Sequence, residues 1–191
     1  RREAPASAAS VRRLFTPSSV AVVGAGSTPG TLGHEVVYNL LAQRFAGTVW
    51  AVNERAHVVC GLPAFPSLLD IPADVDLAVI ATPAERVVES IELCVRKHVR
   101  AVVILTAGFS EAGPEGAAVE AEVVATARRG GVRVLGPNCL GLVNTDPEVR
   151  LHATFAPTAP MEGDIGILAQ SGTLAAAIID RIVHHGRLLE F

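Results

Sequence analysis

The stretch VAVVGAGSTPG, residues 20–30, decides the fold class, because an apolar run enters a glycine-rich turn there. The run from Ser19 to Val23 is typical of a buried strand, and the segment from Thr31 to Gln43 carries apolar residues at helical spacing. Glycine allows a positive φ and a close approach of a ligand to the backbone. The free N–H groups at a helix start attract anions. The stretch predicts a strand–turn–helix unit that holds a phosphate, although a tight turn without a ligand is the alternative.

The same alternation of strands and helices continues to about residue 135. Nearly continuous apolar runs of Val, Ile, Leu and Ala are typical of strands in a buried parallel sheet. We therefore expect an α/β fold, a Rossmann-like parallel sheet with helices on both faces. The further strands expected are Thr48–Val52, Asp76–Ile80, Arg100–Leu105 and Val132–Leu135. The further helices expected run from Thr82 as N-cap and Pro83 as first helical residue to about Lys97, and from Pro114 to Arg129, with residues 61–69 in a loop and a turn.

The composition argues against several classes of protein. The 191 residues are 50% apolar and 4% aromatic with a net charge of −3, and no basic stripe carries aromatic residues, so we expect no nucleic-acid partner. No apolar run reaches the roughly 18 residues of a membrane span, and the first residues do not resemble a signal peptide. The three cysteines lie far apart and form neither a disulfide framework nor a zinc pattern. We expect no metal site, no membrane association and a cytoplasmic location.

The two ends of the chain differ from the middle in amino-acid composition and in the regularity of their apolar pattern. Residues 1–13 are rich in Ala, Ser and Arg and are interpreted as a linker, with a helical turn expected at Val11–Phe15. The expected Rossmann-like domain covers residues 14–145, and the proline-containing stretch 146–163 is interpreted as an irregular connector. A strand at Asp164–Leu168 and a helix at Thr173–His185 would then begin a second domain over residues 164–191. One strand and one helix cannot bury a core, so we expect this domain to be truncated or completed by a partner, and the chain to be a piece of a longer protein.

The glycine turn departs from the dinucleotide-binding fingerprint. The pattern GxGxxG would need a glycine where the chain has Pro29, and Asn53 rather than an acidic residue ends the second predicted strand. A nicotinamide-dependent oxidoreductase is therefore a disfavoured alternative.

Five predicted strand ends should meet at one edge of the sheet, which is where ligands bind in such folds. All five are small, polar or glycine-bearing, so a ligand could lie against their backbone. Arg55 is a candidate phosphate contact, with a solvated loop charge as the alternative. The strand ends are residues 24–27, 53–55, 81–84, 106–109 and 136–139.

The order and spacing of four motifs resemble those of a known family. The motifs are Gly24–Gly30, Thr106–Phe109, Gly136–Gly141 and Gln170–Leu174. Together they resemble the CoA-binding domain and the start of the ligase domain of NDP-forming acyl-CoA synthetases, relatives of the succinyl-CoA ligase alpha subunit. The resemblance covers residues 14 to about 186, which is nearly the whole chain.

The resemblance implies where coenzyme A (CoA) or acyl-CoA would bind. The loop Gly24–Gly30 matches the family loop that holds the nucleotide phosphates, and the strand ends would contact the nucleotide, the pantetheine and the thioester in turn. The acetate-type branch of the family has the small residue that this chain has at Ala107. The cofactor-binding residues implied are Gly26, Ser27, Thr28 and Pro29 for the phosphates, with Gly24 and Gly30 in the same loop; Asn53 and Arg55 for the nucleotide pocket; Thr82 and Pro83 beside the adenine; Leu105, Thr106 and Ala107 for the pantetheine, followed by Gly108; and Asn138 towards the thioester.

A second anion site is implied at Gln170, Ser171 and Gly172, where the family binds the phosphate that is transferred to substrate. A helix start after Ser-Gly suits an anion on physical grounds, but Ser171 as an ordinary N-cap is an equal alternative. The family reaction passes through a phosphorylated histidine in a Gly-His-rich segment, and none of the six histidines here lies in such a setting. We expect no catalytic residue in this chain, and interpret Cys139 as a small apolar filler.

Two full-length proteins are compatible with these residues. One is an acid–thiol ligase that interconverts acyl-CoA, ADP and phosphate with free acid, CoA and ATP, and that binds ATP or ADP and Mg²⁺ in the remaining ligase and ATP-grasp parts. The other is a bacterial protein lysine acetyltransferase in which this module is regulatory, which the segment 9–14 favours by its resemblance to the junction of such fusions. An unfinished domain exposes apolar surface, which favours association into a homo-oligomer. The acyl group is left open.

Overall fold

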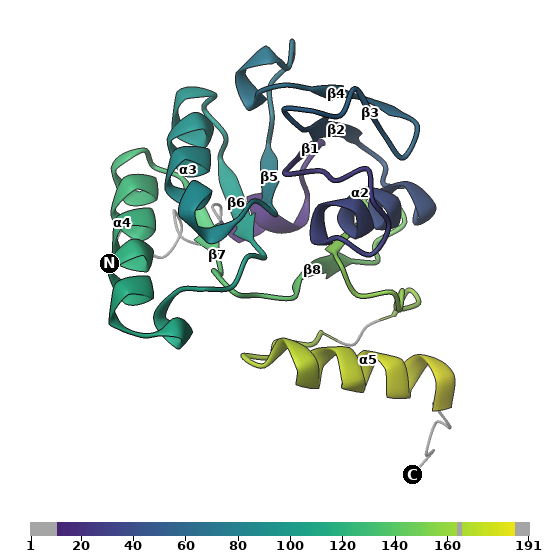
Figure 1. Ribbon diagram of the computed structural model, residues 1–191. Coiled ribbons are helices and arrows are strands. Elements are labelled where there is room, and N and C mark those ends of the chain that lie inside the picture. Colours follow the sequence, from purple (N-terminus) through teal and green to yellow (C-terminus); the bar gives the residue numbers. More distant parts are fainter. Residues whose placement is uncertain (1–10, 164–165, 186–191) are drawn as a thin grey trace, which may run out of the picture.

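The computed structural model describes residues 11–163 and 166–185, and in residues 181–185 it describes the backbone alone. A seven-stranded sheet with the order β3-β4-β2-β1-β5-β6-β7 forms the centre of this part of the chain (Figure 1). Apart from β3, which pairs antiparallel with β4, all neighbouring strands are parallel. The strands are β1 Ser19–Val23, β2 Thr48–Val52, β3 Val58–Val59, β4 Leu62–Phe65, β5 Leu77–Ile80, β6 Ala101–Ile104 and β7 Arg133–Leu135.

Without β3, the strand order is that of doubly wound nucleotide-binding folds, with β1 at the centre and the order reversing between β1 and β5. The prediction of an α/β fold with a Rossmann-like parallel sheet is therefore confirmed. The helices are α2 Leu32–Ala42, α3 Val87–Arg96, α4 Pro114–Arg129 and α5 Gly172–His185, with short 3-10 turns at η1 Leu68–Asp70, η2 Ala84–Arg86 and η3 Ser110–Ala112. The expected helical turn at residues 11–15 is also present.

The alternation of side chains along each strand divides the core into two layers. Val20 and Val22 of β1 pack on the face covered by α2, whereas Ala21 and Val23 pack on the face covered by α3 and α4. The neighbouring strands β5 and β6 alternate in the same way. Because all the residues of these three strands are buried, helices or other elements must cover both faces, and Figure 1 shows α2 on one side and α3 and α4 on the other.

A two-stranded antiparallel ribbon completes the layer that contains α2. It consists of β8 Gly141–Asn144 and β9 Leu151–Thr154, and Leu142, Leu151 and Ala153 of these strands join the core beside α2. The buried Asn39 of α2 donates from Nδ2 to the carbonyl oxygen of Thr154 at 2.8 Å and to that of Ala156 at 3.0 Å. The prediction that residues 146–163 are irregular is therefore wrong over β9. The sequence of β9, Leu-His-Ala-Thr, does not indicate a fully buried strand, because two of its four residues are polar.

Three other expectations differ from the structure. A hairpin, β3–β4, stands in the stretch after β2 where a loop was expected, and Pro63 of β4 is paired with Val58 of β3. The α3 helix begins at Val87 rather than Pro83, because the 3-10 turn η2 intervenes, and Thr82 makes no cap hydrogen bond. Residues 166–168 are not in a strand, and residues 164–165 of the strand expected there lie outside the described part. None of the described helices combines the length and the apolar content needed to cross a bilayer.

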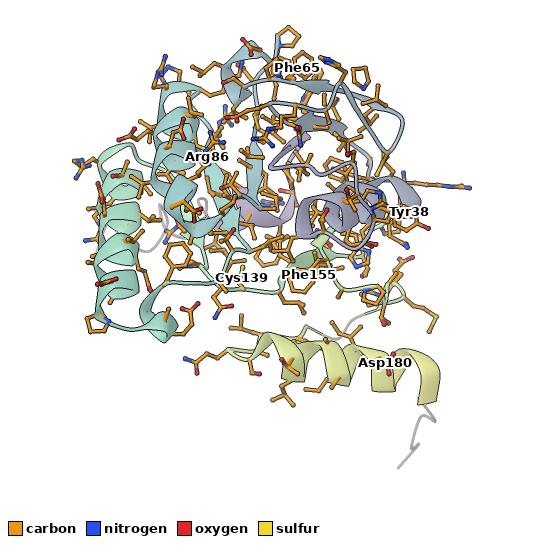
Figure 2. All side chains as sticks on the ribbon, viewed as in Figure 1. Tyr38, Phe65, Arg86, Cys139, Phe155 and Asp180 are labelled. Atoms are coloured by element: carbon orange, nitrogen blue, oxygen red, sulfur yellow. The ribbon has the colours of Figure 1, made fainter. Side chains whose placement is uncertain are left out.

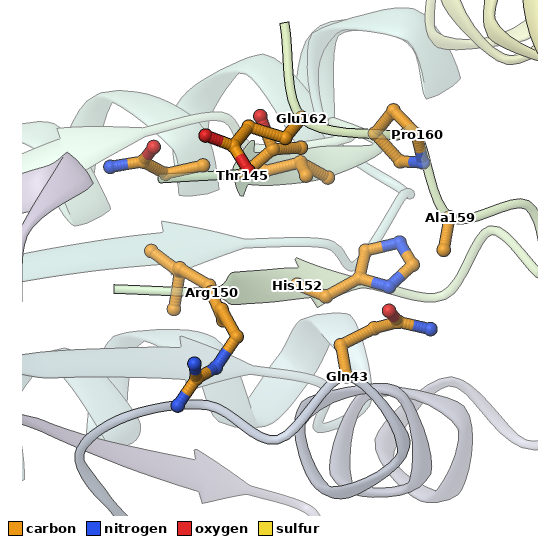
Figure 3. Close-up of a pocket in the computed structure, with 10 residues that line it drawn as sticks. Gln43, Thr145, Arg150, His152, Ala159, Pro160 and Glu162 are labelled. Atoms are coloured by element: carbon orange, nitrogen blue, oxygen red, sulfur yellow. The ribbon is translucent and has the colours of Figure 1, made fainter. Parts of the chain in front are cut away.

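A buried histidine in β9 faces a cavity of about 180 Å³. His152 is 2% exposed, and neither ring nitrogen has a hydrogen-bond partner among the described residues. Figure 3 shows the imidazole between Gln43, at the end of α2, and Ala159, with Glu162 and Arg150 also lining the cavity. Burial penalises the charged imidazolium and lowers the pKa of His152 to about 4.

This histidine should make the fold sensitive to mild acid. The pKa of His152 lies below the usual value of about 6.5, so between these values the unfolded chain takes up a proton that the folded chain does not. The contribution of His152 to stability is therefore fully present above pH 6.5 and falls as the pH drops, by about 2 kcal/mol at pH 5. Urea unfolding at pH 7 and pH 5 measures the loss.

His152→Asn should reduce that pH dependence, whereas His98→Asn at an exposed position should not. Equal pH dependence in the wild type and His152→Asn would contradict a buried neutral imidazole as the cause.

Candidate functional site

The carboxyl ends of β1, β2 and β5 are packed together at the point where the strand order reverses. The amide nitrogens of Gly24 and Ala25 both donate to the carbonyl oxygen of Val52 at 3.1 Å, which ties the turn after β1 to the end of β2. On the other side, a Cβ atom at Gly24 would lie 2.8 to 2.9 Å from backbone atoms of Ala81 and Thr82. With φ at +87°, glycine is required here on both counts. The predicted strand-end residues around Gly24 are thus brought together.

The loop from Ser27 to Gly30 is exposed and leads into α2. No side chain caps the N-terminus of α2, since the hydroxyl of Thr31 donates instead to the carbonyl oxygen of Thr28 at 2.8 Å. The first-turn N–H groups of α2 are therefore available to an anion. The carboxylate of Glu35 accepts from the Gly30 amide at 2.7 Å and from His34 Nδ1 at 3.1 Å, and the bond from Gly30 lowers the pKa of Glu35. Glu35 was missed by sequence reasoning, and it holds the end of the loop.

Asn53 supports the loop rather than presenting free polar atoms. Its Nδ2 donates to the carbonyl oxygen of Ala25 at 2.7 Å, and its Oδ1 accepts from the backbone amides of Arg55 at 2.8 Å and Ala56 at 2.7 Å. The side chain thus joins the turn after β1 to the turn after β2. Arg55, the candidate phosphate contact, is exposed on the second of these turns.

An ion pair crosses between the turn after β2 and the start of α3. Arg86 Nη2 donates to Glu54 Oε1 at 2.5 Å and to Glu89 Oε2 at 3.1 Å. Sequence reasoning missed Arg86, which stands 32 residues after Glu54. The order β2-β1-β5 places these strand ends on either side of β1. A predicted strand order was therefore the signal that could have indicated the ion pair.

The expected adenine and pantetheine contacts follow the ends of β5 and β6. Thr106 is 7% exposed, and its hydroxyl donates to the carbonyl oxygen of Thr82 at 2.6 Å, so it braces the two strand ends from beneath. Pro83, Ala107 and Gly108 are exposed above this brace. The Gly108 amide donates to Glu111 Oε1 at 2.6 Å. The exposed edge here is formed by small residues and backbone, which leaves room for a narrow flexible chain.

The segment after β7 reaches the same edge. The backbone amide of Asn138, which has a φ of 52°, donates to the carbonyl oxygen of Thr106 at 2.9 Å. The Cys139 thiol lies 3.2 Å from the carbonyl oxygen of Ile104, and burial raises its pKa. A half-buried thiol with a raised pKa is a poor nucleophile at neutral pH, which supports a packing role for Cys139.

The second predicted anion site lies against this segment. A Cβ atom at Gly172 would stand 3.1 Å from that of Leu140, two residues beyond Asn138. The Ser171 hydroxyl accepts from the Leu174 amide at 3.3 Å, as an N-cap does, so the capping alternative is present in the structure. Gln170 is exposed beside it. In Figure 2, Cys139 and Phe155 lie on the side of the sheet that faces α5.

The strand order, the glycine turn at the reversal point and the uncapped α2 define a nucleotide-binding α/β domain of the Rossmann type. The chain belongs, more narrowly, to the family described as the CoA binding domain, whose sequence model matches residues 18–145.

Comparison with curated proteins identifies ADP-forming acetate–CoA ligases as similar. Acetate–CoA ligase [ADP-forming] I of Archaeoglobus fulgidus is 46% identical over 170 residues, which is 89% of this chain and 24% of that protein. The alpha subunit of acetate–CoA ligase [ADP-forming] I of Pyrococcus furiosus is 40% identical over 174 residues, which is 89% of this chain and 37% of that subunit. The chain therefore spans well under half the length of these relatives.

Solved structures give the same result. The dinucleotide-forming acetyl-coenzyme A synthetase 1 of Ca. Korarchaeum cryptofilum, in complex with phosphate and ADP, superposes with a TM-score of 0.85 at 39% identity. The match covers 91% of this chain and 36% of that one. The protein PH0766 of Pyrococcus horikoshii superposes with a TM-score of 0.86 at 40% identity, over 91% of this chain and 39% of that one.

Removing the Asn53 side chain should destabilise the contact between the turn after β1 and the turn after β2. Asn53→Ala deletes the bond to Ala25 and leaves two backbone amides without their acceptor, which should cost about 1–3 kcal/mol of stability. Chemical denaturation measures this loss. Asn53→Asp keeps the acceptor but loses the donor to Ala25, so its stability should lie between those of the wild type and Asn53→Ala. Unchanged stability in both variants would contradict the bracing role.

Proposed function

We propose that this chain is the CoA-binding module of an NDP-forming acyl-CoA synthetase. The observation that carries the proposal is the 46% identity, over 89% of the chain, to a protein named as an ADP-forming acetate–CoA ligase. The site supports it, because an uncapped helix and an exposed glycine loop stand at the point where the strand order reverses. The full-length protein would interconvert acyl-CoA, ADP and phosphate with free acid, CoA and ATP.

The proposed site residues would hold CoA along the carboxyl edge of the sheet, with its nucleotide at the glycine loop and its thiol towards Asn138. The pyrophosphate would accept hydrogen bonds from the first turn of α2 and from the exposed hydroxyls of Ser27 and Thr28. The adenosine would lie between residues 53–55 and residues 82–83, on either side of the turn after β1. The pantetheine would run along Ala107 and Gly108 towards Asn138, where backbone and small side chains leave space. The bound thiol would supply the nucleophile that forms the thioester.

The reaction itself would depend on parts of the protein outside this chain. A phosphorylated histidine, ATP or ADP and Mg²⁺ would belong to the remaining ligase domain and an ATP-grasp domain or subunit. Within the described residues, no group of three or more His, Cys, Asp or Glu side chains could hold a metal ion. The start of α5 at Gln170–Gly172, packed against Leu140, would hold the transferred phosphate near the thioester end of CoA. This chain alone would bind CoA without turnover.

The comparisons favour the ligase over the two alternatives. A match to the CoA binding domain family over residues 18–145 does not support a nicotinamide-dependent oxidoreductase. Three of the similar proteins reported above are named as ligases or a synthetase, which argues against the regulatory module of a lysine acetyltransferase. A phosphorylatable histidine in the full-length protein would separate the ligase from that second alternative.

Calorimetric titration of the chain with CoA, acetyl-CoA, NAD and NADP tests the proposal. We expect CoA and acetyl-CoA to bind and the two nicotinamide dinucleotides to bind much more weakly or not at all. Binding of NAD in preference to CoA would overturn the proposal.

A negative charge on the glycine loop should oppose the pyrophosphate. A change at Gly26 would be ambiguous, because its Cβ would lie 2.5 Å from the hydroxyl oxygen of Thr31. Ser27→Asp places the charge on an exposed side chain instead, and should weaken CoA binding about tenfold or more. Titration calorimetry compares it with Ala46→Asp, an exposed position at the opposite edge of the sheet. Equal affinity in the two variants would count against the loop as the phosphate site.

A further inference from the structure

The ion pair between Glu54 and Arg86 spans the centre of the proposed nucleotide site. Arg86 reaches Glu54 with Nη2 and Glu89 with Nη2 and Nε, at distances of 2.5 to 3.2 Å. The loops after β2 and β5 flank the end of β1, so a bond between Glu54 and the start of α3 crosses above that end. Figure 2 marks Arg86 beside α3. The guanidinium is thus held between the turn after β2 and the first turn of α3 by two carboxylates.

The location matches the ribose position of doubly wound nucleotide folds. In these folds an acidic residue at the end of the second strand binds the ribose 2′-hydroxyl of NAD, and an arginine nearby accommodates the 2′-phosphate of NADP. Here the strand-end side chain, Asn53, is occupied by three backbone hydrogen bonds. The next residue, Glu54, is held by Arg86, so neither side chain is free to grip a ribose diol. The cation that contacts Glu54 here is Arg86, from the start of α3.

The charged side chains around Glu54 would favour a ligand phosphate only if an arginine donated hydrogen bonds directly to it. The hydrogen bond from Arg86 lowers the pKa of Glu54, which is therefore ionised at neutral pH and would repel a phosphate if unpaired. Arg86 and Arg55 balance Glu54 and Glu89, so net charge alone does not attract an anion. Recognition must come from directed donors. Arg86 Nη1 makes no hydrogen bond within the described part of the chain, and the side chain is 41% exposed.

CoA carries a phosphate on the 3′-oxygen of its ribose, whereas dephospho-CoA and NAD do not. We propose that Arg86 binds this ribose phosphate through its Nη1 edge, with Glu54 and Glu89 holding the guanidinium in place, and so makes the site selective for CoA over dephospho-CoA. This inference rests on the proposed CoA site. A bond between guanidinium and phosphate is among the stronger charge-assisted hydrogen bonds and gives geometric specificity.

The test compares the affinities of CoA and dephospho-CoA for three variants of the chain. Arg86→Gln should weaken CoA about tenfold while changing dephospho-CoA less than about twofold, so that the ratio of the two affinities collapses. Arg86→Lys keeps the charge without the planar fork and should recover part of the ratio. Arg96→Gln, an equal change of charge at the exposed far end of α3, is the matched control and should leave the ratio as in the wild type.

Each outcome is decisive for one of the two proposals. A wild-type chain that does not bind CoA would overturn the proposed function and this inference with it. A wild-type chain that binds CoA, with the same ratio in Arg86→Gln, would overturn only the role of Arg86. An equal loss in Arg96→Gln would assign the effect to general charge and would also overturn that role. Thermal unfolding of each variant separates loss of fold from loss of contact.

Discussion

The close approach of backbone at Gly24 is the constraint on which the site depends. One carbonyl oxygen, that of Val52, accepts the amides of both Gly24 and Ala25, and the opposite side of Gly24 leaves no room for a Cβ beside Ala81. Three strand ends therefore meet without a side chain between them. This contact fixes where α2 begins and where its unpaired N–H groups point. Pro29 lies in the exposed loop above this contact and takes no part in it.

Polar side chains at the carboxyl edge of the sheet fall into two groups, those bonded to the backbone of neighbouring turns and those exposed to solvent. Asn53, Thr106 and Glu35 are consumed by bonds to the backbone of neighbouring turns, so they hold the loops against one another. Ser27, Thr28 and Arg55 lie outside that framework and are exposed. A site built in this way is rigid beneath and adaptable above, which suits a long ligand that lies along backbone rather than in a deep pocket.

The sequence predicted the central sheet well because β1, β5 and β6 are nearly continuous apolar runs, which are typical of parallel strands covered on both faces. It predicted β9 poorly, since His152 and Thr154 are polar residues that become buried only when α2 supplies Asn39 and the ribbon supplies a partner strand. The position of the candidate site at one edge of the sheet was predicted from the ends of the expected strands. The Glu54–Arg86 pair did not, because it depends on the spatial neighbourhood of two loops that are distant along the chain.

The bonds from Asn39 to the carbonyl oxygens of Thr154 and Ala156 have a mechanical consequence. They fasten the outgoing chain to the same helix whose first turn faces the glycine loop. Any rotation of α5 relative to the sheet must therefore pivot beyond Ala156, in the stretch that contains Pro157 and Pro160. Helix α2 therefore makes two different connections: its first turn follows the glycine loop, and Asn39 holds the chain that leads on to α5.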